Sequence, residues 1–286
     1  SPPRTRERED KLAVACADPQ LFDRFLAAKG AKFRRLAAPV AIVEAVRAGL
    51  VTPFAEAVAH ERAAFLKLRE GPQSKALRHV FAAERTASKV PGIAADTSTM
   101  PIGSVGVIGA GTMGAGIAMT FLSAGFPVTL VEASAQALER GVESIARTID
   151  RSVASGRIGR ESAHRMLAAL EPSLEMPSLG TADLIVEAAY ESMEVKQQIF
   201  ASLDKIAKPQ AILATNTSYL DVDAIAGATS RPDHVLGLHF FSPAHVMKLL
   251  EIVRGDQTSP TVLASALALA RQIGKVAVVA GNAHGF

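Results

Sequence analysis

From residue 104 onward, short apolar runs alternate with longer stretches in which apolar residues recur every three to four positions. The short runs are rich in Val and Ile, which is typical of buried β-strands, and the longer stretches fit amphipathic helices. This alternation predicts an α/β fold with a doubly wound, mainly parallel sheet. The expected strands are 105–108, 128–131, 183–187, 211–214, 234–241, 248–253 and 276–280. The expected helices are 115–124, 134–154, 160–170, 193–206, 221–226 and 260–273.

The first third of the chain has helical periodicity without any strand signal. Residues 21–89 predict successive helices, with Phe54, Val58, Phe65 and Leu68 on one stripe and Leu77, Val80 and Phe81 on the inner face of the last. Pro91 and Gly92 stop this pattern. We therefore expect a helical segment over 1–92, a linker over 93–101 and an α/β domain over 102–286. Residues 1–20 are polar, and we expect them to be disordered or to continue an upstream segment.

The first expected strand leads into three glycines with the spacing G-x-G-x-x-G. Gly109 permits a tight turn, Gly111 lets a pyrophosphate approach the backbone, and Gly114 lets the following helix pack on the strand. Glu132 ends the second strand, where an acid would hold the ribose hydroxyls of NAD. Strand, glycines, helix, strand and acid in this order predict a Rossmann-type dinucleotide site that prefers NAD to NADP. The alternative is a glycine turn inside an α/β core.

Polar residues also follow the other expected strands. In an open α/β sheet, ligands bind beyond the carboxyl ends of the strands, so these residues are candidates for one shared site. They are Tyr190 and Glu191, then Asn216, Thr217 and Ser218, and then His239.

His239 and Glu251 form the strongest candidate for catalysis. Ser242 and Pro243 favour a turn between the two flanking strands. If these strands pair antiparallel about His245, positions 239 and 251 lie directly opposite each other, and opposed side chains can touch. A carboxylate fixes the tautomer of a histidine, as a general base for an alcohol requires. A purely structural His–Glu hydrogen bond is the alternative.

The remaining candidates for chemistry are weaker. His60, His79 and His164 lie among charges on expected helices and are predicted at the surface, while His234 opens a strand and His245 is a turn residue. No His, Cys or Asp cluster has metal-ligand spacing, so we expect no metal. Ser218, His239 and Glu251 could be a hydrolase triad, but Ser218 is not in a G-x-S-x-G turn.

Composition narrows the class of protein. The 286 residues are 49% hydrophobic and 21% charged, as in a globular protein. The net charge of +3 is mild and the charges are interspersed, which does not indicate nucleic-acid binding. A single cysteine, Cys16, rules out an internal disulfide. No apolar run reaches membrane-spanning length, and the N-terminus lacks a secretory signal.

Four motifs carry a family resemblance. The stretches GAGTMGAGIA, VEAAYES with Lys196, ATNTSYL and GLHFFSPAHVMKLLEIVRG resemble the NAD domain of L-3-hydroxyacyl-CoA dehydrogenases. The helical stretch before them resembles the segment that joins a crotonase-like hydratase domain to such a dehydrogenase. This arrangement is found in fatty-acid oxidation complex alpha subunits and peroxisomal bifunctional enzymes.

The resemblance implies roles for individual residues. His239 would be the catalytic base, Glu251 its partner, and Ser218 a contact of both cofactor and substrate hydroxyl. Ser242 stands where the family often has asparagine, and it keeps hydrogen-bonding capacity with a shorter reach. Besides the three glycines, the implied NAD contacts are Thr112, Met113, Glu132, Ala189, Tyr190, Glu191, Lys196, Asn216, Ser218 and Ser242.

The function implied is NAD-dependent oxidation of L-3-hydroxyacyl-CoA to 3-oxoacyl-CoA in fatty-acid β-oxidation. A hydratase core would lie upstream of Ser1 and a second, helical dehydrogenase domain after Phe286, so we expect a piece of a larger enzyme. The implied partners are an acyl-CoA and a thiolase subunit. We expect a bacterial-type cytoplasmic enzyme, with a peroxisomal one as the alternative. The rival function is a dinucleotide-sensing or scaffolding module without turnover.

Overall fold

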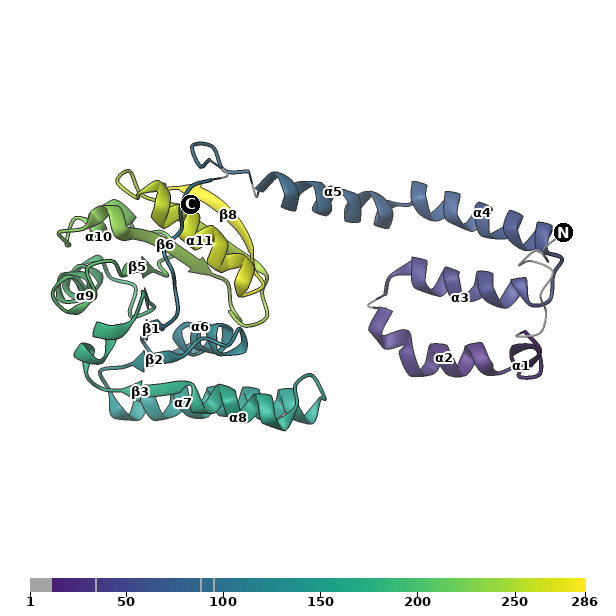
Figure 1. Cartoon of the computed structure of the whole chain (residues 1–286), viewed down its shortest axis with the longest axis horizontal. Helices are drawn as coiled ribbons and strands as arrows, with labels where there is room; N and C mark the ends of the chain where they lie inside the picture. Colours follow the sequence, from purple (N-terminus) through teal and green to yellow (C-terminus); the bar gives the residue numbers. More distant parts are fainter. Residues whose placement is uncertain (1–11, 34, 88, 95) are drawn as a thin grey trace. The chain divides into compact units, whose positions relative to one another are not determined.

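The computed structural model divides the chain into two units, residues 1–86 and residues 87–286 (Figure 1). It describes residues 12–33, 35–87, 89–94 and 96–286. The expectation for residues 1–20 therefore falls partly outside the described residues, and the part inside contains a single helical turn, α1 (Ala13–Cys16).

Unit 1 is helical, as predicted. Its remaining elements are α2 (Leu21–Lys29), the 3₁₀ turn η2 (Gly30–Phe33), α3 (Ala37–Gly49), α4 (Phe54–Glu70) and α5 (Pro72–Ala87), whose last residue already belongs to unit 2. Proline sits in the first turn of α3 and α5 or immediately before α4, where its missing N–H costs no helical hydrogen bond.

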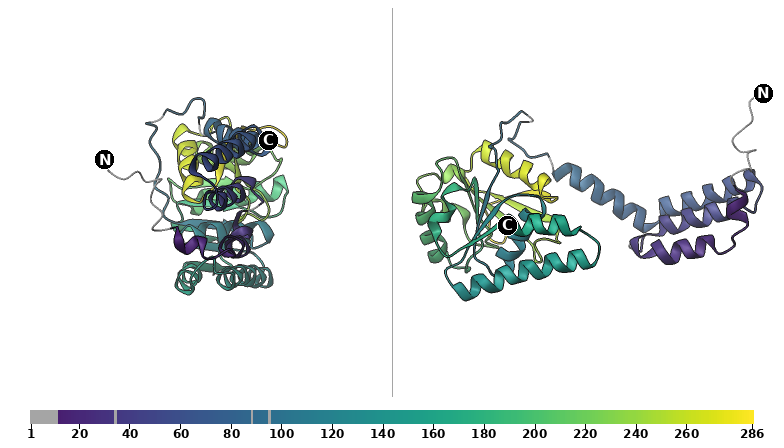
Figure 2. Two further views of the ribbon diagram at one scale, coloured as in Figure 1. Left: turned by 90° about the vertical axis from the view of Figure 1, so that its right-hand side faces the viewer. Right: turned by 60° about the horizontal axis from the view of Figure 1, so that its bottom comes forward.

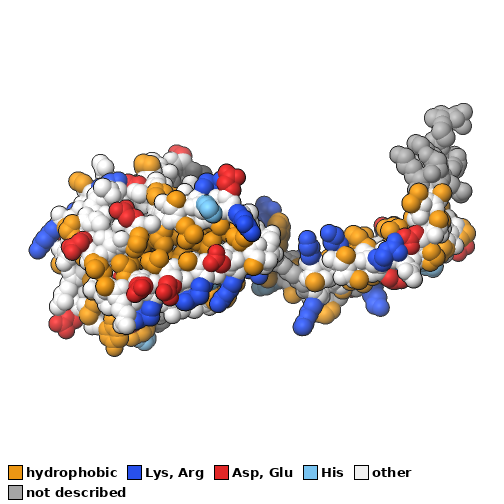
Figure 3. All heavy atoms as spheres, turned by 90° about the horizontal axis from the view of Figure 1, so that it is seen from below, with side chains coloured by type: hydrophobic (Ala, Val, Ile, Leu, Met, Phe, Trp, Pro, Cys, Tyr) orange, Lys and Arg blue, Asp and Glu red, His pale blue; other side chains and the backbone are white. Residues whose placement is uncertain are grey.

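The predicted inner face of α5 is not buried. Leu77, Val80 and Phe81 are each more than half exposed, and Phe54 and Phe65 of α4 are as well. Hydrophobic side chains are visible along this unit between charged ones (Figure 3). The expectation failed because amphipathic spacing indicates which face of a helix is apolar, but not whether another element covers that face.

Unit 2 is built on one eight-stranded sheet in the order β3-β2-β1-β4-β5-β6-β7-β8. The first six strands in this order, from β3 to β6, run parallel to one another. Strand β7 is antiparallel to β6, and β8 is parallel to β7. The strands are β1 (Val105–Ile108), β2 (Val128–Val131), β3 (Leu170–Ser173), β4 (Leu184–Glu187), β5 (Ile212–Thr215), β6 (Val235–Phe240), β7 (Leu249–Arg254) and β8 (Val276–Gly281).

Helices cover both faces of this sheet (Figures 1 and 2). One apolar cluster takes in buried residues of α6, α7, α8 and α11, and a second takes in buried residues of α9 and α10. The helical elements are α6 (Thr112–Ser123), α7 (Ala135–Ala154), α8 (Arg160–Ala168), η3 (Met176–Thr181), α9 (Met193–Ile206), α10 (Val222–Ala226), η4 (Pro232–His234) and α11 (Pro260–Gln272). The doubly wound, mainly parallel α/β prediction is confirmed.

Side-chain caps explain several of the helix starts. The Ser134 hydroxyl accepts a hydrogen bond from Ala137 N at the start of α7, and the Asp221 carboxylate accepts two at the start of α10. Ser259 caps α11 before Pro260 in the same way. These caps satisfy N–H groups that have no partner inside a helix.

Two parts of unit 2 differ from expectation. Strand β3 was not predicted, because its sequence, LEPS, carries no alternation, and it is an edge strand held by pairing with β2. The expected linker 93–101 has no regular secondary structure in its described residues, 93–94 and 96–101. Ile93 and Met100 nevertheless pack against the sheet cluster, and Met100 N donates to the Ser265 hydroxyl. The unit boundary consequently falls between residues 86 and 87 rather than after 92.

Candidate functional site

The glycine turn lies between β1 and the start of α6. Gly109 has a φ of +95°, and a Cβ there would meet the carbonyl oxygen of Ala188 at 2.6 Å. A Cβ on Gly114 would lie 1.7 Å from the carbonyl oxygen of Gly109, so helix and turn can approach only without a side chain. At Gly111, by contrast, no heavy atom of the described residues, apart from the glycine and its two chain neighbours, lies within 4 Å of the Cβ position. The turn is therefore closed toward the sheet and open at its middle glycine.

Glu132 follows β2 and its carboxylate lies against this turn. Its Oε2 accepts a hydrogen bond from Ala110 N at 2.9 Å, and its Oε1 accepts one from Ala133 N at 2.8 Å. The acid is thus fixed beside the glycine turn, where a ribose of a bound dinucleotide would lie.

The carboxyl ends of β4 and β5 are joined through Glu191. Its Oε1 accepts hydrogen bonds from the Thr217 hydroxyl and, at 2.9 Å, from Ser218 N, while its Oε2 lies 3.1 Å from Lys196 Nζ. Burial alone would raise the pKa of Glu191, but these hydrogen bonds and the lysine charge outweigh it and hold that pKa below its ordinary value. The Glu191 carboxylate is consequently ionised and fixed.

Asn216 and Ser218 have different surroundings. The Asn216 side-chain oxygen accepts a hydrogen bond from Phe240 N at 2.8 Å and so ties the end of β5 to the end of β6. Ser218 is exposed, as is Tyr190 at 79%. Ala189 N donates at 2.8 Å to Glu187. Ser218 and Tyr190 therefore both have side chains that a ligand could reach.

His239 and Glu251 are paired, as their positions in the sequence predicted. They are register partners of β6 and β7, and His239 Nδ1 lies 2.8 Å from Glu251 Oε2. Because a carboxylate can only accept, Nδ1 carries the proton, which leaves Nε2 as the nitrogen able to take one. The histidine ring lies against Phe241, with 4.5 Å between ring centroids.

The turn that follows His239 carries Ser242, which is exposed. Lys275, just before β8, holds this turn: its ammonium donates to the carbonyl oxygens of Ala244 and, at 2.7 Å, of Met247. Burial lowers the pKa of Lys275. Sequence reasoning missed this lysine, since nothing in its local pattern marks it.

Lys196 lies where a direct ligand contact is difficult. Its side chain is 1% exposed, and its ammonium contacts both carboxylate oxygens of Glu187, at 2.7 and 2.9 Å. Glu187, fully buried at the end of β4, was not among the predicted site residues. Its signal was available, because an acid that ends a four-residue apolar strand must find a buried partner.

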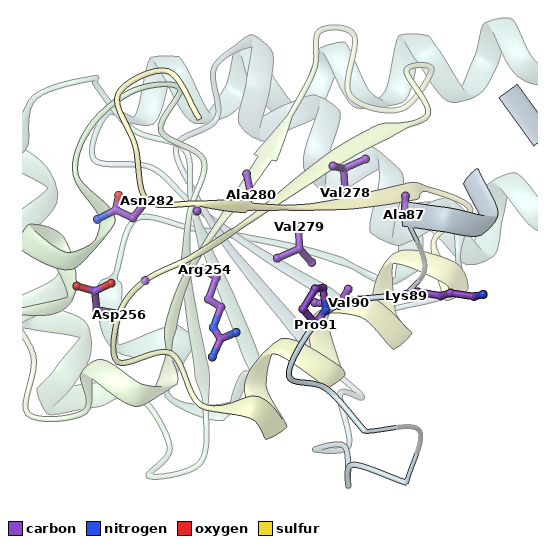
Figure 4. Close-up of a pocket in the computed structure, with 12 residues that line it drawn as sticks. Ala87, Lys89, Val90, Pro91, Arg254, Asp256, Val278, Val279, Ala280 and Asn282 are labelled. Carbon is purple, nitrogen blue, oxygen red and sulfur yellow. The ribbon is translucent and has the colours of Figure 1, made fainter. Parts of the chain in front are cut away.

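The residues of the candidate site therefore lie together at the carboxyl ends of the parallel strands. Two hollows of about 530 and 570 Å³ lie elsewhere, against residues 89–91 and neighbouring segments. Figure 4 shows the first, lined by Val278, Val279 and Ala280 of β8 and by Arg254 at the end of β7. Because β7 and β8 run opposite to β6, their carboxyl ends lie on the side of the sheet where the parallel strands begin, away from the candidate site.

The alternatives weighed from sequence fare differently. His60, His79 and His164 are exposed, as predicted. Among the described residues no hydrogen bond joins Ser218 to His239, so the hydrolase triad has no support. No group of three or more potential metal ligands comes together in the described ranges. No helix in the described parts of the chain is both long and apolar enough to cross a membrane.

These residues fit a dinucleotide. The open space at Gly111 gives a pyrophosphate room to reach the backbone at the start of α6, whose N-terminal N–H groups favour an anion. The fixed carboxylate of Glu132 adjoins the turn on one side. The fold and the site together define a dinucleotide-binding domain of the Rossmann type.

The comparison with family models identifies the family. The model described as "3-hydroxyacyl-CoA dehydrogenase, NAD binding domain" matches residues 104–283. The chain belongs to this family, and NAD is its cofactor.

Curated relatives include the peroxisomal bifunctional enzyme of Cavia porcellus, 43% identical over 87% of this chain and 35% of that protein. The human peroxisomal bifunctional enzyme is 41% identical over 86% of this chain and 34% of its own length. The chain thus spans about a third of the length of these relatives.

Solved structures agree with this assignment. The 3-hydroxybutyryl-CoA dehydrogenase of Escherichia coli is 41% identical with a TM-score of 0.64, over 65% of this chain and 40% of that one. The dehydrogenase part of multifunctional enzyme 1 from C. elegans is 31% identical with a TM-score of 0.61, over 70% of this chain and 48% of that one.

Proposed function

We propose that this chain supplies the NAD-binding domain of an enzyme that oxidises L-3-hydroxyacyl-CoA to 3-oxoacyl-CoA. The observation that carries the proposal is the His239–Glu251 pair, placed at the same sheet edge as the glycine turn. Binding a dinucleotide requires no histidine fixed by a carboxylate, so this pair favours turnover over a sensing or scaffolding role.

In the proposed reaction, His239 Nε2 takes the proton of the substrate's 3-hydroxyl group. The carbon–hydrogen bond at C3 breaks as the carbonyl forms, and NAD, when bound, would supply the acceptor for the hydride. Glu251 stabilises the imidazolium and keeps Nδ1 protonated, so that the ring presents Nε2 throughout. Ser218, which is exposed and whose backbone N–H donates to Glu191, would donate a hydrogen bond from its hydroxyl to the developing carbonyl oxygen.

The acyl-CoA substrate is supported by the Escherichia coli relative, which is a 3-hydroxybutyryl-CoA dehydrogenase, and the thiolase partner stays a prediction. The peroxisomal bifunctional enzymes support a peroxisomal location and the Escherichia coli dehydrogenase supports a bacterial-type cytoplasmic one, so both locations stay predictions. Glu132 supports a preference for NADH over NADPH, because its charge would face the 2′-phosphate of NADPH.

The test replaces His239 by Gln in a chain extended to the length of its relatives. We expect kcat to fall by roughly 10²–10⁴, the usual scale of general base catalysis. NADH affinity, measured by fluorescence titration, should stay within about twofold, because His239 does not contact the glycine turn. The control is His164→Gln, at an exposed histidine of α8, which should change neither quantity.

If the His239→Gln variant weakens NADH binding as much as it slows turnover, the histidine is structural and the catalytic proposal fails. If the unchanged protein binds NADH but does not turn over 3-hydroxyacyl-CoA, the sensing or scaffolding role replaces it.

A further inference from the structure

A chain of buried polar contacts runs from the middle of the sheet to the exposed turn at Ser218. It begins at Glu187, which is 0% exposed at the end of β4. Glu187 Oε2 accepts a hydrogen bond from the hydroxyl of Thr215, its register partner on β5, at 2.7 Å. Its Oε1 accepts one from Ala189 N at 2.8 Å. Both carboxylate oxygens also accept from Lys196, so the buried acid is fully satisfied.

Lys196 is the next link. It projects from the first turns of α9, and its ammonium lies between two carboxylates, that of Glu187 and that of Glu191 at 3.1 Å. With three carboxylate oxygens around it and 1% exposure, this ammonium has little capacity left for a ligand. Its position suits a bridge between the two acids better than a direct cofactor contact.

Glu191 is the last link, and the only one of the three that reaches solvent, at 30% side-chain exposure. The oxygen that does not face Lys196 holds the Thr217 hydroxyl and Ser218 N. Thr217 N in turn donates at 3.3 Å to the Thr215 hydroxyl, which closes the loop of contacts. The backbone of Ser218 is thus held by a series of contacts that starts at Glu187, inside the sheet, and passes through Lys196 and Glu191.

We propose that Glu187 is a positioning residue of the cofactor site, acting through Lys196 on Glu191 and on the turn that carries Ser218. This inference rests on the proposed NAD site. A buried acid paired with a lysine is costly to desolvate and does not by itself indicate stability. Here the pair does something an apolar pair could not, because the Lys196 ammonium also contacts the carboxylate of Glu191.

The experiment is a double-mutant cycle on NADH affinity, measured by fluorescence titration of the full chain. Glu187→Gln removes the charge that holds Lys196, and we expect NADH to bind roughly tenfold more weakly. In a Glu191→Gln background the same change should weaken NADH binding by less than twofold. In that background residue 191 no longer carries the charge through which Lys196 acts on the site. A merely structural role would give the same loss in both backgrounds.

A matched control tests whether loss of any carboxylate contact on α9 has this effect. Asp204 lies on the same helix and pairs with Arg231 at 2.9 Å, with no contact to Lys196. Asp204→Asn should lower the melting temperature while leaving NADH affinity within about twofold.

Two further variants keep the proposal testable if Glu187→Gln does not fold. Glu187→Gln with Lys196→Met removes both buried charges together and leaves neither unpaired in the interior. Because Glu191 also loses its cation, we expect this variant to weaken NADH binding at least tenfold, and unchanged affinity would overturn the positioning role. Thr215→Val removes the hydroxyl that donates to the Glu187 carboxylate. We expect it to weaken NADH binding roughly threefold in the otherwise unchanged chain, and to leave NADH binding unchanged in the Glu191→Gln background.

The outcomes separate this proposal from the function on which it rests. If the unchanged chain binds no NADH, the proposed function fails. If it binds NADH and Glu187→Gln or Thr215→Val has no effect, or has the same effect in both backgrounds, the positioning role alone is overturned.

Discussion

Helix α3 of unit 1 and helix α6 of unit 2 are similar in length, with 13 and 12 residues, and both are rich in small and apolar side chains. They differ in what surrounds them. Helix α3 buries a single residue, Val43, whereas α6 buries eight, among them Ile117 and Phe121. Comparable sequences therefore reach different degrees of burial.

The physical reason is the presence of a sheet. In unit 2, α6 packs on parallel strands that are themselves apolar on both faces, so nearly every side of the helix meets other atoms. In the described part of unit 1, α3 contacts mainly α4, with fewer contacts to α2 and η2, and these helices carry large apolar side chains that stay exposed to water. Because burial of apolar surface dominates folding free energy, the two units should differ in stability far more than their composition suggests.

The largest expected effect comes from separating the units. Residues 87–286 alone should unfold in a single cooperative transition, because both apolar clusters of the sheet lie within them. Residues 1–86 alone should melt gradually, because Val43 is their only buried residue among those described. Circular dichroism melts of the two pieces make the measurement, and a sharp transition in residues 1–86 would break the comparison.

A matched pair of substitutions tests the difference in burial between the two units at single residues. Phe200 of α9 is fully buried and Phe65 of α4 is 54% exposed. Phe200→Ala should lower the free energy of unfolding by about 3–5 kcal/mol, the usual loss for a buried aromatic ring. Phe65→Ala should change it by less than about 1 kcal/mol. Chemical denaturation of both variants gives the values, and equal losses would show that unit 1 has a core after all.

A smaller effect is expected in acid. Burial would raise the pKa of Asp183, Glu191 and Asp204, but hydrogen bonds and neighbouring cations hold each pKa below its ordinary value of 3.8 or 4.5. A carboxyl whose pKa is lowered by folding stabilises the fold above its unfolded pKa, and this contribution is lost as the pH falls through the folded pKa.

We therefore expect the melting temperature of residues 87–286 to be steady near neutral pH and to fall progressively below about pH 4.5. Asp204→Asn should make this fall shallower, because one of the three carboxyls no longer titrates. A melting temperature that does not change between pH 6 and pH 3 would contradict the assignment.

The smallest effects should come from exposed ion pairs, and they should be alike in the two units. Glu161 pairs with Arg165 on α8, and Glu70 pairs with Arg69 on α4, all with side chains about half exposed or more. Glu161→Gln and Glu70→Gln should each change the free energy of unfolding by less than about 0.5 kcal/mol. A large loss in unit 1 alone would mean that charge pairing, rather than burial, holds its helices.

Local sequence pattern determined much of unit 2. Strands β1 and β2 and helix α9 have the predicted bounds or lie close to them, because their apolar spacing and glycine signals act over a few residues. The pairing of His239 with Glu251 was also readable, since one turn between two adjacent strands sets the register by counting. The order of glycines, helix, strand and Glu132 pointed to the dinucleotide site for the same reason.

The tertiary structure alone decided which polar groups are buried together and which apolar faces are covered. Glu187, Lys196 and Thr215 come from β4, α9 and β5, and Lys275 reaches a turn 28 residues before it. Nothing in the pattern around any one of them specifies its partner, and the apolar stripe of α5 did not reveal that it is exposed. Local spacing fixes the direction of a side chain along its own element, whereas its partner depends on how distant elements pack.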